Sequence, residues 1–121
     1  MCPPVASLIL PWRVGQPAAD DLILTGRSIS SAEAKELGLV HSVSDHPEVK
    51  VEEFLKPHIL PKSAAALRLA VRASRFGMHR AFLADIQVLE EMYLRDLMAT
   101  RDAHEGIEAF MEKHQPVWRN C

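Results

Sequence analysis

Signals that start and stop helices recur along the whole chain, and they constrain its fold more than any other feature. Ser30, Ser63 and Thr100 each precede a segment with apolar residues at helical spacing. A hydroxyl at such a place accepts a hydrogen bond from a free backbone N–H of the first turn. Gly38 follows the segment that Ser30 introduces, and Gly26 follows an earlier one at residues 16–24, each at a place where glycines commonly end helices. No segment has the pattern of a substantial strand, so the sequence predicts a nearly all-α protein.

The start and stop signals divide the chain into a series of helices. Pro57 interrupts a weak helical pattern, and Gly77 is expected to end the helix that precedes it. The run 39–43 is expected to be extended. Pro116 is expected to stop the last helix. The predicted helices are residues 16–24, 31–37, 48–59, 64–76, 79–99 and 101–115.

The first fifteen residues have a different character. They are mostly apolar, Pro3 and Pro4 lie near their start, and no capping residue introduces them. We expect residues 1–15 to be an extended segment that packs against something upstream, and residues 16–121 to form a helical domain. The apolar run is far too short to cross a bilayer, and it lacks the basic start and cleavage site of a signal peptide.

Composition sets the class of protein. The chain has 121 residues, enough for one modest domain. Its formal net charge of −2 argues against general nucleic-acid binding, which needs an excess of Lys and Arg. Cys2 and Cys121 lie at the two ends and form no C-x-x-C pair. Free thiols in a reducing cytoplasm, and no membrane partner, are therefore expected.

No motif for metal binding or nucleophilic catalysis is present. His104 and Glu105 begin a pattern like H-E-x-x-H, but the second histidine that zinc needs is absent. There is no G-x-S-x-G elbow, and the serines are explained by helix caps. Glu90 and Glu91 could be an acid/base pair, but a solvated helix face is the simpler interpretation. The sequence predicts neither a metal site nor a catalytic residue.

Three arginines form a stripe along the helix at 64–76. Arg68, Arg72 and Arg75 lie at i, i+4 and i+7, so they share one face. Such a stripe could bind phosphates, although no glycine-rich phosphate loop accompanies it. The favoured interpretation is ion pairing with acidic residues of a neighbouring helix, with Glu90 and Glu91 as candidates.

The last helix contains the sharpest candidate for a binding site. Phe110 and Lys113 are three residues apart near the helix end, so an aromatic ring and an ammonium share a face. This pair suits a ligand that carries an aromatic base and a phosphate. The alternative is a packing residue beside a lysine that compensates the helix dipole.

Two blocks of sequence resemble one known family. Residues 105–118, ending in Ala-Phe-Met-Glu-Lys-His-Gln-Pro-Val-Trp, resemble E-G-x-x-A-F-x-E-K-R-x-P-x-[FW], the C-terminal signature of the enoyl-CoA hydratase/isomerase (crotonase) family. Residues 24–40 resemble the L-T-G-x-x-[IF]-[ST]-A-x-E-A-x-x-x-G-L-V block of the same family. The resemblance covers nearly all of this chain and about the C-terminal half of a family member.

This resemblance implies a fold, a substrate class and an assembly. Family members have a spiral of ββα units followed by a helical C-terminal region that drives trimers, often paired into hexamers. The chain is thus expected to be the all-α C-terminal oligomerisation region of the crotonase fold, without the spiral, and residues 1–15 to be left from it. Members bind acyl-CoA thioesters as substrates and need no other cofactor. Two backbone N–H groups form an oxyanion hole that polarises the thioester carbonyl. In hydratases, upstream glutamates deliver the water and the proton. The resemblance carries no catalytic residue onto this chain. It places Phe110 and Lys113 near the CoA adenine and 3′-phosphate.

Two functional hypotheses follow. The first is the assembly and CoA-contacting domain of an acyl-CoA hydratase, inactive as an isolated fragment. Residues 3–7, 61–63 and 91–94 are similar to the family's cyclohexa-1,5-diene-1-carbonyl-CoA hydratase subgroup, which acts in anaerobic degradation of aromatic compounds. The second is a stand-alone helical oligomerisation module without catalytic activity.

Overall fold

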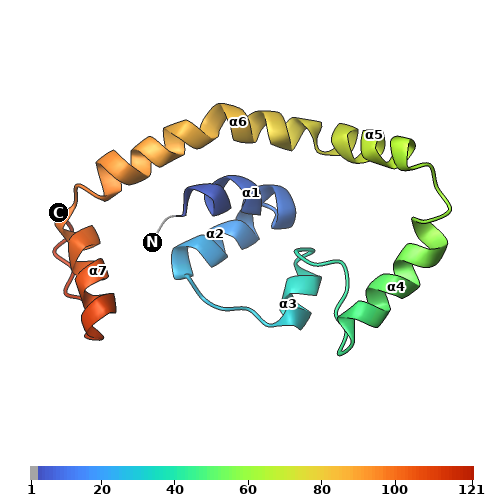
Figure 1. The fold of residues 1–121 in the computed structure, drawn as a ribbon. Coiled ribbons are helices and arrows are strands. Elements are labelled where there is room, and N and C mark those ends of the chain that lie inside the picture. Colours follow the sequence, from blue (N-terminus) through green and yellow to red (C-terminus); the bar gives the residue numbers. More distant parts are fainter. Residues whose placement is uncertain (1–2) are drawn as a thin grey trace.

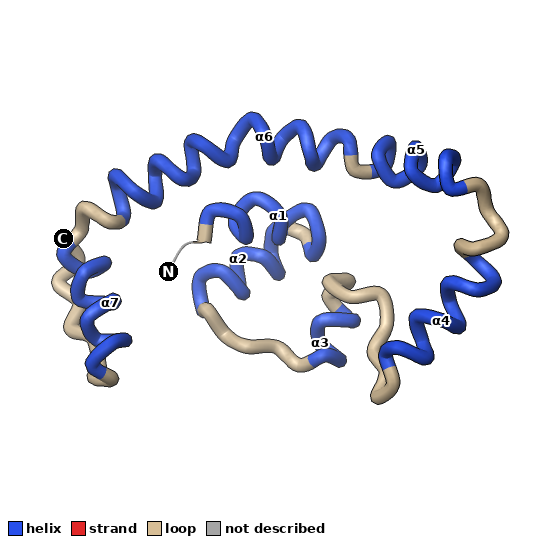
Figure 2. The backbone as a smooth tube through the Cα atoms, viewed as in Figure 1, coloured by secondary structure: helices blue, strands red, loops and turns tan. Residues whose placement is uncertain are grey.

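The computed structural model describes residues 3–121, and all regular structure in that range is helical, as predicted (Figures 1 and 2). The helices in chain order are α1 (Pro4–Val14), α2 (Gln16–Thr25), α3 (Ser31–Glu36), α4 (Pro47–His58), α5 (Ala64–Ser74), α6 (Phe76–Glu91), the π-helical turns η1 (Met92–Leu97) and α7 (Arg101–Glu112).

The helices form an arch over a helical pair. Figure 1 shows α5 and α6 in line across the top, with α4 descending from one end and α7 from the other. Beneath them lie α1 and α2, which pack against each other, and α1 also packs against α6.

The predicted caps are confirmed by hydrogen bonds. The hydroxyl oxygens of Ser30, Ser63 and Thr100 accept from backbone N–H groups three residues on, at 3.1, 3.4 and 3.1 Å. Gly26 and Gly38 have left-handed backbone angles, with φ of 61° and 76°. Both glycines lie just past a helix, where a side chain would be strained.

The expectation of an extended segment at the N-terminus is wrong for residues 4–14, which form α1. Pro4 takes a first-turn position, where its missing N–H costs nothing. The segment is apolar on most sides because it packs against both α2 and α6. Residues 1–2 lie outside the described range. The division into residues 1–15 and 16–121 remains a prediction, although α1 packs directly on α2 across that boundary.

Three further boundaries differ from the sequence prediction. Gly77 does not end a helix: the break is at Arg75, with φ −99° and ψ 1°, and Gly77 lies in the first turn of α6. Residues 39–43 form no strand, and the N–H groups of Leu39 and Val40 both donate to the carbonyl of Ala34. The last helix ends at Glu112, before Pro116.

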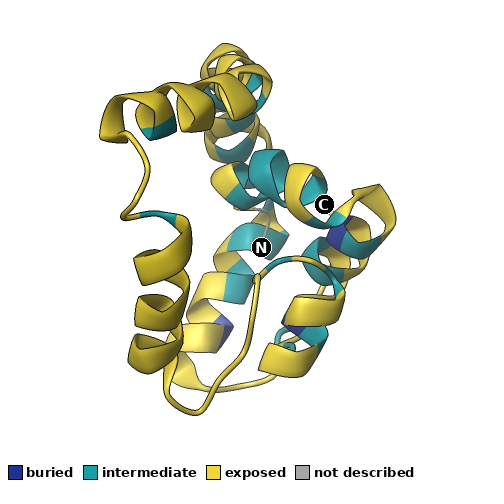
Figure 3. Cartoon of the chain, turned by 90° about the vertical axis from the view of Figure 1, so that its right-hand side faces the viewer, coloured by how far each residue is buried: buried dark blue, intermediate teal, exposed yellow. Residues whose placement is uncertain are grey.

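The core is thin. Within residues 3–121 only Ala19, Ala34 and Ala109 are buried, and no large side chain is (Figure 3). The chain exposes 9839 Å², against about 6500 Å² for a compact monomer of its mass of 13.5 kDa. The helices therefore leave much of their apolar surface to solvent.

Candidate functional site

The C-terminal tail folds back along α7 and is held by two carboxylates. Asp102 accepts from the backbone N–H groups of Arg119 and Asn120, each at 2.8 Å. Glu105 accepts from the N–H of Val117 at 2.9 Å. Both acids lie in the first half of α7, where their negative charge also interacts favourably with the positive end of the helix dipole. The tail is therefore fixed by charge-assisted hydrogen bonds to the helix that precedes it.

The contacts between the tail and α7 form a brace, and Trp118 completes it by packing on the helix. A Cβ built on Gly106 would lie 3.2 Å from Cη2 of Trp118, so the indole ring rests on the backbone of α7. Below the ring is a pocket of about 280 Å³, lined by Tyr93, Leu97, Met98, Asp102, Ala103, Gly106, Ile107 and Trp118. The glycine and the tryptophan of the C-terminal signature thus make one packing contact.

The two predicted site residues lie beyond this brace, at the C-terminal end of α7. Phe110 is 86% exposed, although neighbouring Ala109 is buried. Lys113 is exposed and follows the last helical residue. No ion pair or side-chain hydrogen bond within residues 3–121 engages its ammonium. An apolar ring and an unpaired cation are thus offered to solvent at one helix end.

Lys113 also has an unusual backbone. Its φ of 59° and ψ of 38° are left-handed, and its N–H donates to the carbonyl of Ala109. Glycine is the usual residue at such a position because any Cβ is strained there. A lysine at a glycine position departs from the local rule, and such departures concentrate at functional sites.

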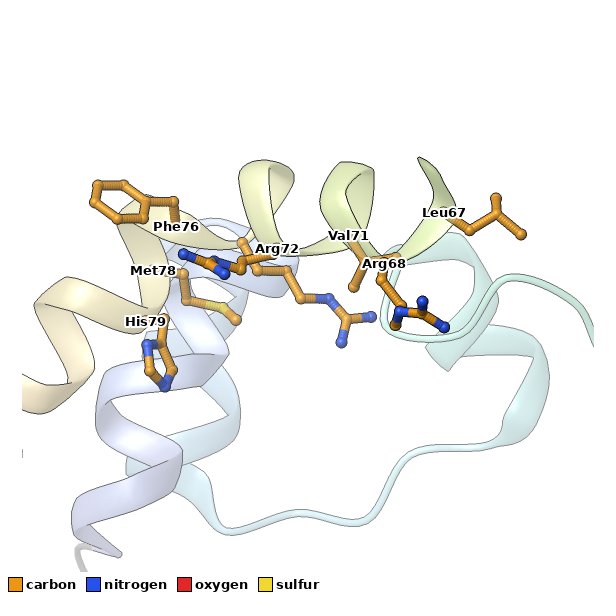
Figure 4. Close-up of a pocket in the computed structure, with 8 residues that line it drawn as sticks. Leu67, Arg68, Val71, Arg72, Phe76, Met78 and His79 are labelled. Carbon is orange, nitrogen blue, oxygen red and sulfur yellow. The ribbon is translucent and has the colours of Figure 1, made fainter. Parts of the chain in front are cut away.

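The arginine stripe borders a separate groove. Figure 4 shows Arg68 and Arg72 reaching from α5 beside Val71, Met78 and His79. The groove has a volume of about 750 Å³, and no acidic side chain lines it. The favoured pairing of this stripe with Glu90 and Glu91 is wrong within the chain, since none of the ion pairs in residues 3–121 involves these groups.

One arginine elsewhere does form ion pairs. The guanidinium of Arg27 lies 2.7 Å from carboxylate oxygens of both Asp21 and Glu33, and so joins the end of α2 to the start of α3. Hydrogen bonds to Glu33 and then Asp21 raise the pKa of Arg27 further above its ordinary value. This cluster holds the loop between the two helices.

No metal-binding cluster occurs in the part of the chain that the structure describes: no three His, Cys, Asp or Glu side chains converge. His41 and His58 instead flank the ring of Phe54, with ring centroids 5.7 and 5.2 Å away. None of the helices in residues 3–121 is long and apolar enough to span a bilayer.

Sequence reasoning missed the roles of Asp102, Glu105 and Gly106. Two acids in the first turns of a helix need no explanation beyond compensation of the helix dipole, so the sequence alone indicates no further role for them. A glycine inside a helix lowers stability by about 1 kcal/mol relative to alanine. The glycine at position 106 could therefore have indicated that another part of the chain approaches the helix closely there. Its partner is twelve residues away along a tail that reverses direction, which local spacing does not show.

With this geometry in hand, comparison with known proteins defines the class. Residues 1–120 match the enoyl-CoA hydratase/isomerase family, and the chain belongs to that family. It is 42% identical over 117 residues to the cyclohexa-1,5-dienecarbonyl-CoA hydratase of Thauera aromatica, covering 97% of this chain and 45% of that protein. It is 37% identical over 112 residues to mouse enoyl-CoA hydratase domain-containing protein 2, covering 88% and 38%.

Solved structures agree on the fold. The crystal structure of enoyl-CoA hydratase from Bacillus anthracis is 34% identical and superposes with a TM-score of 0.56, over 96% of this chain and 45% of that one. Pseudomonas aeruginosa DspI is 30% identical with a TM-score of 0.53, over 94% and 44%. The chain spans less than half the length of these relatives, and it is the helical C-terminal part of their fold.

Proposed function

We propose that this chain is the assembly and CoA-contacting domain of an acyl-CoA hydratase, which adds water to an enoyl- or dienoyl-CoA thioester and needs no cofactor beyond that substrate. In this proposal the chain acts in the cytoplasm, within a trimer or a pair of trimers, and carries no catalytic residue. Phe110 contacts the adenine and Lys113 the 3′-phosphate of CoA.

The single observation that carries the CoA contact is the left-handed lysine. Lys113 holds its strained backbone at an exposed position without an ion pair in residues 3–121. Phe110, three residues earlier, is exposed as a flat apolar surface. An adenine ring can stack on an aromatic side chain, and a phosphate accepts charge-assisted hydrogen bonds from an ammonium.

Similarity favours a cyclic dienoyl thioester as substrate, and so a role in the degradation of aromatic compounds. The 42% identity to the Thauera aromatica hydratase extends over 117 residues, which is nearly the whole chain.

The second candidate function is an assembly module without catalytic activity. The large exposed surface and thin core favour this reading as strongly as the first, because both require partners on the apolar helix faces. The two differ in whether CoA touches α7.

Kinetics of the complete hydratase that carries this chain would decide. Lys113→Ala removes one charge-assisted contact, which is worth roughly 1–2 kcal/mol in a partly exposed site. The KM for the CoA thioester should rise about tenfold with kcat nearly unchanged, because a remote contact binds ground and transition states alike. Dephospho-CoA thioesters should show little difference between the two proteins.

The matched control is Lys62→Ala, which removes an exposed lysine without an ion pair in the described chain. It should leave both KM values unchanged. If Lys113 only compensates the helix dipole, Lys113→Ala will change stability by about 0.3–1 kcal/mol and neither KM, and the proposed CoA contact is then wrong.

A further inference from the structure

The C-terminal tail, residues 113–121, has an unusual backbone near each of its ends. Lys113 and Asn120 are the two non-glycine residues with left-handed backbones in residues 3–121, at φ of 59° and 58°. Asparagine visits this conformation readily, whereas lysine does not favour it. A residue in such a conformation keeps it where the surrounding structure imposes it. Contacts outside Lys113 itself must therefore hold its backbone.

The far part of the tail is anchored on the first half of α7. Three N–H groups of residues 117–120 donate to the carboxylates of Asp102 and Glu105, at 2.8 to 2.9 Å. The carbonyl oxygen of Cys121 accepts from the N–H of Arg101 at 3.1 Å. The tail thus returns beside α7 to the end at which that helix begins (Figure 1).

Anchoring at residue 117 leaves little chain for the reversal. Val117 is bonded to Glu105, which lies seven residues and about 10 Å before Glu112 along the helix axis. Only residues 113–116 join the helix end to Val117, and a chain spans at most about 3.5 Å per residue. A further helical residue would carry the chain away from its anchor. The direction must therefore change at Lys113, and its left-handed backbone makes that change.

Asp102 is too far from Lys113 to act on its ammonium directly. The two residues are eleven positions apart in sequence, which is about 16 Å along the axis of α7. This separation is about twice the screening length of charges at physiological ionic strength. The direct effect that remains has the opposite sign, because a carboxylate repels a phosphate. A loss of phosphate binding on removal of Asp102 must therefore be transmitted through the tail.

We propose that the brace positions the CoA contact. Asp102 and Glu105 fix the tail, and the fixed tail holds Lys113 in the left-handed conformation that places its ammonium for the 3′-phosphate. This inference rests on the proposed function, and it adds two positioning residues that touch neither CoA nor the reacting atoms. Phe110 lies within α7, so its ring is placed by the helix and does not depend on the brace. The brace therefore acts on recognition of the phosphate and not of the adenine.

Amide exchange tests the link without CoA. The N–H groups of Lys113 and His114 both donate to the carbonyl of Ala109. In Asp102→Ala, exchange at these two residues should become several-fold faster, because release of the tail lets the turn open locally. Glu108→Ala is the matched control. It removes an acid from the same helix, without a hydrogen bond to the tail in the described chain, and should leave both rates unchanged.

Kinetics of the complete hydratase test the consequence for binding. Asp102→Ala should raise the KM for the CoA thioester about three- to tenfold with kcat nearly unchanged, because positioning cannot be worth more than the contact that it positions. The KM for the dephospho-CoA thioester should hardly change. In a Lys113→Ala background, Asp102→Ala should add nothing, since the positioned group is already gone. Glu108→Ala should leave both KM values unchanged.

Two substitutions at Glu105 separate the hydrogen bond from the charge. Both Glu105→Gln and Glu105→Ala remove the negative charge, but only glutamine keeps an oxygen that can accept from Val117. Glu105→Ala should raise the KM for the CoA thioester about threefold, and Glu105→Gln should stay close to the original protein. This pair also keeps the inference testable if Asp102→Ala lowers the helix content, which circular dichroism measures.

Faster exchange at residues 113 and 114, together with a rise in KM that depends on the 3′-phosphate, would support the inference. It is overturned if Asp102→Ala frees the N–H groups of Arg119 and Asn120 while exchange at Lys113 stays slow. The turn then holds itself, and the CoA contact still stands. It is also overturned if Asp102→Ala raises both KM values equally, or if the two Glu105 variants behave alike. An unchanged KM in Lys113→Ala instead contradicts the proposed CoA contact, and this inference falls with it.

Discussion

Gly106 faces the indole ring of Trp118 so closely that a methyl group on the glycine would lie 3.2 Å from Cη2 and 3.5 Å from Cζ3. Contacts this short require a neighbour to move. The tail ring therefore limits the residue that the middle of α7 can hold, although the two positions are twelve apart in sequence.

A pair of glycine substitutions should reveal this contact. In α6, Gly77 has no atom within 4 Å of its built Cβ, so Gly77→Ala should stabilise the chain by about 1 kcal/mol through helix propensity. Gly106→Ala should gain distinctly less, because Trp118 must shift. Urea denaturation measures both. Equal gains at the two positions would show that the ring does not constrain the helix.

Removing the carboxylate of Asp102 should release the tail. Asp102→Ala deletes the acceptor for two backbone N–H groups, those of Arg119 and Asn120. We expect amide exchange at both residues to become at least about tenfold faster, since each lost bond to a charged group is worth roughly 1.5–3 kcal/mol. Glu108→Ala, on the same helix with no hydrogen bond to the tail in the described chain, is the control and should leave exchange slow.

Replacing Lys113 by glycine should raise the stability of the chain and weaken CoA binding. The left-handed backbone suits glycine, so Lys113→Gly should stabilise the chain by about 1 kcal/mol while weakening CoA binding in the complete enzyme. Glu112→Gly, one residue earlier in helical conformation, should destabilise by a similar amount. A loss of stability in Lys113→Gly would contradict the strain argument.

The ion pairs of Arg27 should make a salt-dependent contribution. Arg27→Met removes the contacts to Asp21 and Glu33 at the junction of α2 and α3. Because all three side chains are partly exposed, the decrease in Tm should be small at low ionic strength and smaller still in about 1 M NaCl. A decrease that is the same at both salt concentrations would point to lost packing of the arginine stem.

The 121-residue chain on its own should not hydrate acyl-CoA thioesters. The resemblance carries no oxyanion hole or catalytic glutamate onto it. Absorbance of an enoyl- or dienoyl-CoA thioester should therefore change at the buffer rate even under excess protein. Turnover that survives repurification would contradict the proposal that this chain carries no catalytic residue.

Local chemistry predicted much of the fold. The caps at Ser30, Ser63 and Thr100 and the glycine at 26 were predicted because each acts on neighbours within four residues. The helix α1 was missed because its stability comes from packing against α2 and α6, which the sequence pattern does not display.

The candidate site divides in the same way. Phe110 and Lys113 were identified from their spacing and the family signature, and their role in binding CoA stays a prediction. The left-handed angles of Lys113 could not be predicted, since lysine has no preference for them. The hydrogen bonds that Asp102 accepts depend on a chain reversal near Pro116, and only the folded tail brings the two donor N–H groups within reach.

The three buried alanines have a thermodynamic consequence. Unfolding raises heat capacity in proportion to the apolar surface that it newly exposes, and this chain leaves many large apolar side chains exposed when it is folded. Its unfolding should therefore have a heat-capacity increment below the roughly 12–15 cal/mol/K per residue of compact domains, and a correspondingly shallower dependence on urea. Further hydrophobic free energy becomes available when partners cover the arch, so the melting temperature should rise with protein concentration.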